Sequence, residues 1–328
     1  MPLVTVLATG GTMASRTGAG GAATAQDDGA DLVARLDLPP GIELRVRDVF
    51  RVGSYRMTLD RLHELARAVA AELRDERVDG LVVTHGTDTT EESAFFLDLF
   101  HDDARPVVLT GAQRAADASD SDGPRNLTDA VTVAAAPLAR GLGVLIGFGG
   151  QLFPARGTRK GHTLAADAFL NPAGGPLGWI HGGDVGIVTQ PRRGPALPLD
   201  AFDPAGVRVD VVACYPDADA TALRACADAG ARGIVLEATG AGNANPLICA
   251  AVAELTAAGV VVVTSTRVAA GPVAAIYGDG GGIDLVRAGA VPSGLLRPPQ
   301  ARVLLAALLG IHGDPAVVRQ AFAERAGG

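Results

Sequence analysis

The sequence predicts an α/β protein with two domains, each built on a parallel sheet covered by helices. Strand-sized apolar runs alternate with helical patterns along the chain, which favours parallel strands joined by crossover helices. A proline-rich segment interrupts this alternation, and polar residues follow the ends of several predicted strands. We expect a larger N-terminal domain at residues 1–189 with a doubly wound, flavodoxin-like, mostly parallel sheet. A linker at 190–206 and a smaller, Rossmann-like α/β domain at 207–328 should follow.

The composition favours a globular protein that binds a small molecule. With 328 residues, 48% of them hydrophobic, the chain can bury two cores. Its formal net charge of −8, from 28 basic and 36 acidic residues, gives no attraction to nucleic acid or to an anionic membrane. No apolar stretch approaches the ~20 residues of a membrane-spanning helix. The N-terminus lacks a basic region and a signal-like cleavage site, so we expect a cytoplasmic location.

The three cysteines are expected to be reduced core residues. Cys214, Cys226 and Cys249 are odd in number, lie among apolar residues and lack C-x-x-C spacing. A catalytic thiol is the minor alternative.

The first domain is expected to begin with a strand at residues 3–8 that ends in a glycine turn carrying Thr12. Residues 15–29 are rich in Gly, Ala and Thr without an apolar period, which predicts a loop long enough to be a lid. The clearest helix, at 57–73, has leucines at helical spacing and Thr58 as its N-cap. The other elements expected here are a helix at 31–36, strands at 42–49, 81–84, 106–110 and 142–148, and helices starting near 91 and at 125–135.

The second domain repeats the alternation after a stiff linker. Four prolines between residues 189 and 204 make this segment the best domain boundary. The elements expected beyond it are strands at 207–213, 233–237 and 260–265, and helices at 221–228, 246–258, 299–309 and 315–324.

A dense polar cluster follows the apolar run at residues 80–83. Ligands of an open α/β sheet bind outside the carboxyl ends of its strands, so chemistry is expected where this run ends at Thr84. We interpret His85 as a structural part of the turn. Glu91 and Glu92 are expected to cap the following helix, because the helix dipole favours acids in the first turn.

Hydroxyl groups dominate the candidate chemistry. The chain has no G-x-S-x-G elbow, no phosphate loop and no cysteine or histidine pair at metal-ligand spacing. A threonine such as Thr12 or Thr87 is a useful nucleophile only when a base takes its proton. Lys160 could be that base and Asp88 could orient it, while backbone N–H groups of the glycine turns could bind an oxyanion. These residue types suggest acyl transfer or amide hydrolysis; the alternative is that the threonines cap helices and Lys160 is solvated.

Four motifs resemble those of the bacterial-type L-asparaginase family: T-G-G-T-M-A at 9–14, T-H-G-T-D-T at 84–89, T-G-A-Q-R at 110–114 and D-G-P-R-N-L at 122–127. The similarity extends over nearly the whole chain. It implies hydrolysis of the side-chain amide of L-asparagine to L-aspartate and ammonia through an acyl-enzyme on threonine. It also implies that no cofactor or metal takes part, and that the protein is a homotetramer with sites at a subunit interface.

The resemblance assigns roles residue by residue. Thr12 matches the nucleophile, Thr87 and Asp88 match the second-motif threonine and aspartate, and Lys160 matches the family lysine. Ser54 matches the serine that binds the substrate α-carboxylate, and Asp88 would also hold the α-ammonium group. The implied substrate-binding positions are Gly53, Ser54, Tyr55, Gly86, Thr87, Asp88 and Ala112. Asn245 matches a second-domain asparagine near the site, with a helix N-cap as the equally favoured alternative.

Three departures leave substrate preference open. No tyrosine precedes Tyr55, although the family has one in the loop after the first motif, and Ala22 lies near its place. Tyr55 itself replaces a glutamine that helps bind the α-ammonium group. An acid from a neighbouring subunit is also missing, for which Tyr277 or Asp279 could substitute. The alternatives are a glutaminase-type subunit of a tRNA amidotransferase, which would usually carry an extra N-terminal domain, and a non-catalytic amino-acid-binding protein.

Overall fold

The chain divides into two compact units, Met1–Leu197 and Pro198–Gly328. The computed structural model describes residues 1–18, 20, 22–34 and 36–327. The boundary between the units lies inside the proline-rich segment 190–206 that was expected to be the linker. None of the helices in the described part of the chain combines the length and the apolar character that crossing a membrane requires.

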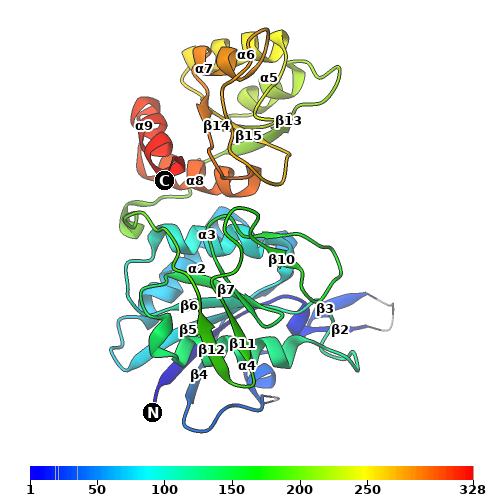
Figure 1. Cartoon of the computed structure of the whole chain (residues 1–328), viewed down its shortest axis with the longest axis vertical. Coiled ribbons are helices and arrows are strands. Elements are labelled where there is room, and N and C mark those ends of the chain that lie inside the picture. The colour runs from blue at the N-terminus through cyan, green and yellow to red at the C-terminus, as the bar shows by residue number, and fades with distance from the viewer. Residues whose placement is uncertain (19, 21, 35, 328) are drawn as a thin grey trace. The chain divides into compact units, whose positions relative to one another are not determined.

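The first unit is built on an eight-stranded sheet (Figure 1). Its strands are β1 (Leu3–Gly10), β4 (Glu43–Val52), β5 (Val78–Thr84), β6 (Val107–Thr110), β7 (Val144–Phe148), β8 (Gln151–Pro154), β11 (Gly178–His181) and β12 (Asp184–Ile187). They lie in the order β12-β11-β8-β7-β6-β5-β1-β4. Two antiparallel pairs lie outside this sheet: β2 (Ser15–Thr17) with β3 (Ala23–Ala25), and β9 (Arg159–Lys160) with β10 (Phe169–Leu170).

The parallel part of the sheet has the predicted doubly wound order. Strands β4, β1, β5, β6 and β7 are neighbours in parallel pairs, which is the order 2-1-3-4-5 of a flavodoxin-like sheet. The chain direction across the sheet reverses between β1 and β5, and ligands of such sheets bind at this reversal. The expected fold class is confirmed.

Helices cover both faces of this sheet. They are α1 (Gly29–Val33), α2 (Leu59–Glu72), α3 (Thr90–Phe100) and α4 (Gly123–Ala135), with a short 3₁₀ turn at Pro137–Ala139. Figure 1 shows α2 and α3 on one side of the sheet and α4 on the other. Helix α4 is amphipathic, and its apolar side chains, Leu127 and Val131 among them, join one core cluster with Val6, Val82 and Val108 of the strands.

The prediction of a loop at residues 15–29 was only partly correct. Strands β2 and β3 form a short hairpin within it, and α1 begins at Gly29 rather than at residue 31. The Arg16 guanidinium donates to the Asp27 carboxylate at 2.6 Å. This ion pair holds the two ends of the segment together, although the segment has no apolar period. Strand β4 also runs to Val52, past the expected end at residue 49, because its pairing with β1 continues to Gly10.

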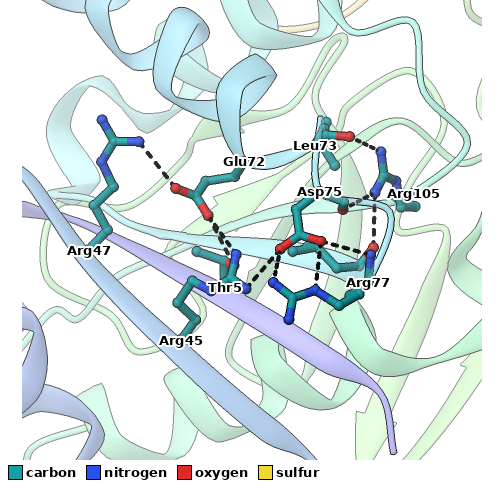
Figure 2. Close-up of polar contacts among 9 residues, drawn as sticks. Thr5, Arg45, Arg47, Glu72, Leu73, Asp75, Arg77 and Arg105 are labelled. Carbon is teal, nitrogen blue, oxygen red and sulfur yellow. Dashed lines mark hydrogen bonds and ion pairs between the residues drawn. The ribbon is translucent and has the colours of Figure 1, made fainter.

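A network of charged side chains ties the sheet to the end of α2 (Figure 2). Glu72 accepts hydrogen bonds from Arg45 and from the buried Thr5 hydroxyl, each at 3.4 Å. Asp75, in the turn after α2, is bound by Arg77 and by Arg45, both within 3.0 Å. These hydrogen bonds hold the pKa of the Asp75 carboxyl well below its ordinary value. The network therefore fixes α2 against β1 and β4.

The second unit has a four-stranded parallel sheet in the order β13-β14-β15-β16. The strands are β13 (Val209–Ala213), β14 (Gly233–Ala238), β15 (Val261–Thr266) and β16 (Val291–Pro292). The helices are α5 (Thr221–Asp228), α6 (Pro246–Ala257), α7 (Gly282–Arg287), α8 (Pro298–Ile311) and α9 (Pro315–Ala326), with a 3₁₀ turn at Leu199–Ala201. The short elements α7 and β16 were not predicted from the sequence.

The cysteines of the second unit are free thiols, as expected. Cys214 and Cys249 are buried in the core between the sheet and helices α5 and α6, and Cys226 is half-buried beside it. Burial raises the pKa of both the Cys214 and the Cys249 thiol to about 11, so both are protonated near neutral pH.

The contact between β5 and α4 predicts that Gly80→Ala destabilises the first unit. A Cβ atom at Gly80 would lie 2.1 Å from the Ala134 carbonyl oxygen, and this is backbone that cannot move aside. We expect a loss of about 1–3 kcal/mol, measured as the free energy of unfolding in urea.

Gly174→Ala is the matched control in the same unit, because its nearest atom, the Asn171 amide oxygen, is 3.9 Å away. It should leave the stability unchanged or raise it by less than about 1 kcal/mol. Equal stability of the two variants would contradict the packing described.

Candidate active site

The carboxyl ends of three parallel strands meet at one edge of the first sheet. Ala8 of β1 pairs with Thr84 of β5, and Thr84 pairs with Thr110 of β6. The Thr9 hydroxyl donates to the Thr84 carbonyl oxygen at 2.7 Å, which holds the first two strand ends together. The turns that follow β1, β5 and β6 therefore begin side by side.

Glycines let these turns pack backbone against backbone. Gly11 has a φ of 82°, and a Cβ atom there would lie 2.4 Å from the Gly86 nitrogen. A Cβ at Gly86 would lie 2.6 Å from the Ser54 hydroxyl, and one at Gly111 would lie 2.3 Å from the His85 carbonyl oxygen. Only glycine fits such approaches. The turns after β1, β4, β5 and β6 thus form one cluster.

Each turn presents a predicted site residue directly after its glycine. Thr12 begins a 3₁₀ turn at Thr12–Ala14, Ser54 begins one at Ser54–Arg56, and Thr87 begins one at Thr87–Thr89. Ser54 and Thr87 are buried and Thr12 is half-buried. Ala112, after β6, is also buried. The structure therefore brings the predicted residues of the first unit together.

Lys160 reaches this cluster from strand β9. Its ammonium nitrogen donates to the Thr87 hydroxyl oxygen at 2.8 Å and to a carboxylate oxygen of Asp88 at 2.8 Å. The Lys160 side chain is 17% exposed and that of Asp88 is 57% exposed, so one partner of the ion pair remains in contact with solvent. A hydroxyl, an amine and a carboxylate in this arrangement can pass a proton along.

Glu91 has a role that the sequence did not reveal. It lies with Glu92 in the first turn of α3 as expected, and the side chain of the N-cap residue, Thr89, makes no capping hydrogen bond. Its buried carboxylate accepts the backbone N–H of Lys160 at 2.6 Å. Burial raises the pKa of the Glu91 carboxyl, and the hydrogen bond from Lys160 acts against that rise. Glu91 therefore anchors the main chain that carries the lysine.

Gln113 belongs to the T-G-A-Q-R motif at 110–114, and the sequence alone does not indicate its role. The Thr87 hydroxyl donates to its side-chain oxygen at 3.0 Å, and its side-chain nitrogen donates to the carbonyl oxygens of Thr163 and Ala165. The Asp122 carboxylate accepts the Gln113 backbone N–H. No sequence signal links Gln113 to Thr87, because 26 residues separate them.

His85 is a structural part of its turn, as interpreted from the sequence. The ring is buried; Nδ1 lies 2.8 Å from the Gly86 carbonyl oxygen and Nε2 lies 3.0 Å from the Ser93 hydroxyl. A carbonyl only accepts, so Nδ1 carries the proton. Burial lowers the pKa of His85 to about 4, so the ring is neutral near pH 7.

Tyr55 lies beside the buried Ser54 but is itself 74% exposed. Its ring packs over Gly53, where a Cβ atom would lie 2.5 Å from a ring carbon. The Thr89 hydroxyl donates to the Ser54 carbonyl oxygen at 2.8 Å and so joins this turn to the one after β5.

The remaining predicted residues belong to the second unit. Asn245 caps α6, because its side-chain oxygen accepts the Ile248 N–H at 3.0 Å, and its amide nitrogen donates to the Ala218 carbonyl oxygen. The capping alternative for Asn245 is therefore confirmed. Tyr277 is 59% exposed and Asp279 has a left-handed backbone, with a φ of 54°.

No group of three or more histidine, cysteine, aspartate or glutamate side chains in the described ranges could hold a metal ion. A charged surface hollow of about 420 Å³ between β4 and α2 is lined by Arg47, Asp60 and His63 among others. It contains none of the predicted site residues.

Comparison with known proteins places this arrangement in a family. The family model described as "Asparaginase, N-terminal" matches residues 3–193, and the model described as "Glutaminase/Asparaginase C-terminal domain" matches residues 208–322. The chain belongs to the asparaginase family. The family membership expected from the four motifs is thereby confirmed.

Individual relatives match over almost their full length. An L-asparaginase of Bacillus licheniformis is 35% identical, with 95% of this chain and 96% of the relative covered. A probable periplasmic L-asparaginase of Haemophilus influenzae is 34% identical, with 99% and 93% covered. The crystal structure of a probable cytoplasmic L-asparaginase from Campylobacter jejuni has a TM-score of 0.85 at 32% identity, with 98% and 99% covered.

The buried His85 predicts a loss of stability as the pH falls from about 6.5 to about 4. In this window the unfolded chain binds a proton that the folded protein excludes, because the folded pKa of about 4 lies below the ordinary 6.5. The loss corresponds to about 3 kcal/mol. Urea unfolding of the wild type and of His85→Gln across this range measures it, and the variant should show the flatter dependence.

Burial also lowers the pKa of His101, so the wild type and His85→Gln will both lose some stability in acid. Only the difference between them reports on His85, and identical pH dependence would contradict the neutral, buried ring.

Proposed function

We propose that the protein is an amidohydrolase that converts L-asparagine to L-aspartate and ammonia through a threonine-linked acyl-enzyme. The observation that carries this proposal is the contact of the Lys160 amine with both the Thr87 hydroxyl and the Asp88 carboxylate at 2.8 Å. This group lies beside the turn that presents Thr12, in a chain of the asparaginase family.

In this proposal the Thr12 hydroxyl attacks the side-chain carbonyl carbon of the substrate. Its proton passes through Thr87 to Lys160, whose position Asp88 maintains. Backbone N–H groups of the glycine turns stabilise the negative oxygen that forms. The carbon–nitrogen bond breaks as the proton returns to the leaving nitrogen, and ammonia departs. Water then attacks the ester on Thr12 and releases aspartate.

The same cluster offers groups for the two charged ends of the amino acid. Ser54 is buried next to Gly86 and would donate its hydroxyl to the α-carboxylate. Asp88 is more than half exposed and would hold the α-ammonium group with the oxygen not bound to Lys160. Gly53, Tyr55 and Ala112 would complete the walls of this site.

The oligomer and the location are further parts of the proposal. We infer a homotetramer with sites at a subunit interface, to which the exposed Tyr277, Asp279 or the loop of Asn245 would contribute. We also infer a cytoplasmic location, which the Campylobacter jejuni neighbour supports and the periplasmic Haemophilus influenzae relative does not.

L-Glutamine is the second candidate substrate, because the model that matches the second unit covers glutaminases as well as asparaginases. Ammonia release from L-asparagine, L-glutamine and D-asparagine by the purified protein ranks the three. We expect the highest kcat/KM with L-asparagine. Exclusive use of L-glutamine would favour the amidotransferase-subunit alternative, and binding by calorimetry without any product would favour an amino-acid sensor.

Thr12→Ala and Thr87→Ala should each lower kcat by more than about 1,000-fold, because each removes a hydroxyl that the reaction uses directly. Thr128→Ala, which removes a hydroxyl from helix α4 of the same unit, is the matched control and should retain activity. Circular dichroism and the melting temperature should be unchanged in all three. Ammonia release at the wild-type rate by either site variant would refute the assignment.

A further inference from the structure

Gln113 makes contacts that connect the proposed catalytic group to the chain that follows Lys160. Its side-chain nitrogen donates to the Thr163 carbonyl oxygen at 3.2 Å and to the Ala165 carbonyl oxygen at 3.1 Å. Its side-chain oxygen accepts from the Thr87 hydroxyl at 3.0 Å. One amide thus contacts both Thr87 and the loop at residues 161–168.

The orientation of this amide follows from its partners. Carbonyl oxygens can only accept hydrogen bonds, so the NH₂ group of Gln113 must face Thr163 and Ala165. Its oxygen must then face Thr87, and because that oxygen only accepts, the Thr87 hydroxyl has to donate. In this resting arrangement Lys160 therefore contacts Thr87 as the donor, at 2.8 Å, into a lone pair of the hydroxyl oxygen. Gln113 sets the direction of the hydrogen bond between lysine and threonine.

The backbone of Gln113 is itself held in place. The Asp122 carboxylate accepts the N–H groups of Gln113 and Arg114 at 3.0–3.1 Å. The Asn126 side chain donates to Asp122 and to the Gly111 carbonyl oxygen, which ties the turn after β6 to the start of α4. The Gln113 side chain therefore extends from a turn whose backbone is held by hydrogen bonds to Asp122 and Asn126.

We propose that Gln113 is a positioning residue for the proton transfer between Lys160 and Thr87. Lys160 donating into a lone pair of Thr87 is the arrangement that returns a proton to the leaving nitrogen. The Thr87 hydroxyl turns from the Gln113 oxygen to the leaving nitrogen and gives its proton to it. A proton moves from the Lys160 ammonium to the Thr87 oxygen, and the carbon–nitrogen bond breaks. The inference rests on the proposed function, because it concerns that site and that reaction.

A structural role in the loop alone would have different consequences, and the chain offers a variant that separates the two. His162 is exposed, and its Nδ1 accepts the N–H groups of Leu164 and Ala165 at 3.0 and 2.9 Å. His162→Leu removes these two bonds from the same loop without touching Thr87. Gln113→Met removes all the side-chain hydrogen bonds of Gln113 at a similar volume.

The test compares wild type, Gln113→Met and His162→Leu with two substrates, L-asparagine and L-aspartic acid β-hydroxamate. The hydroxamate releases hydroxylamine, a weaker base than ammonia, so its departure depends less on a delivered proton. We expect Gln113→Met to lower kcat for L-asparagine about 10- to 100-fold with KM changed less than about 3-fold. Its loss of kcat with the hydroxamate should be several-fold smaller, and His162→Leu should not reproduce this difference between substrates.

Gln113→Glu provides the conservative variant, since it keeps an acceptor for Thr87 and loses the donor to the loop. It should retain several-fold more kcat with L-asparagine than Gln113→Met. Equal losses of Gln113→Met on the two substrates, an unchanged kcat, or the same pattern in His162→Leu would each overturn the proposal.

Hydrogen exchange of the backbone amides at residues 161–165 is read in the same proteins without substrate. Gln113→Met should speed this exchange, because it frees the loop. If the wild type releases no ammonia from any amide tested, the proposed function fails. The exchange measurement then still tests the contact between Gln113 and the loop: faster exchange in Gln113→Met supports this contact, and unchanged exchange refutes it.

Discussion

The contact of backbone with backbone at Gly11 and Gly86 is the constraint on which the site depends. No side chain fits between the turns after β1 and β5, since a Cβ at Gly11 would lie 2.4 Å from the Gly86 nitrogen. Thr12 and Thr87 each follow one of these glycines directly. The two hydroxyl-bearing residues are therefore placed by the packing of main chain at the point where the sheet order reverses, and long flexible side chains do not have to be ordered to bring them together.

Lys160 is held in a different way, by its main chain. The buried Glu91 carboxylate accepts its N–H at 2.6 Å, and Lys160 pairs with Phe169 across the β9–β10 hairpin. These contacts involve only the main chain of Lys160, and its ammonium group contacts Thr87 and Asp88. A lysine that is anchored through its backbone can gain and lose a proton without losing its position, which a general base requires.

The sequence predicted the parts of the site that depend on local chemistry. A buried strand that ends in glycine and threonine is visible in the residues around Thr12 and Thr87, and so is the apolar alternation that gives the sheet. It did not predict contacts that depend on distant pairing. Glu91 meets Lys160 across 69 residues and Gln113 meets Thr87 across 26, and neither pair leaves a periodic pattern. The pairing of β2 with β3 was missed because these short strands carry no apolar stripe, and backbone pairing with an ion pair beside it holds them.

The central claim is that Thr12 becomes acylated while Thr87 transfers protons. Mass spectrometry of peptides from protein mixed with L-asparagine and quenched in acid within one turnover tests it most directly. The predicted result is an aspartyl group on the peptide that contains Thr12, with less of it in Gln113→Met, because that variant forms the acyl-enzyme more slowly. An aspartyl group on the peptide that contains Thr87, with none on Thr12, would contradict the account.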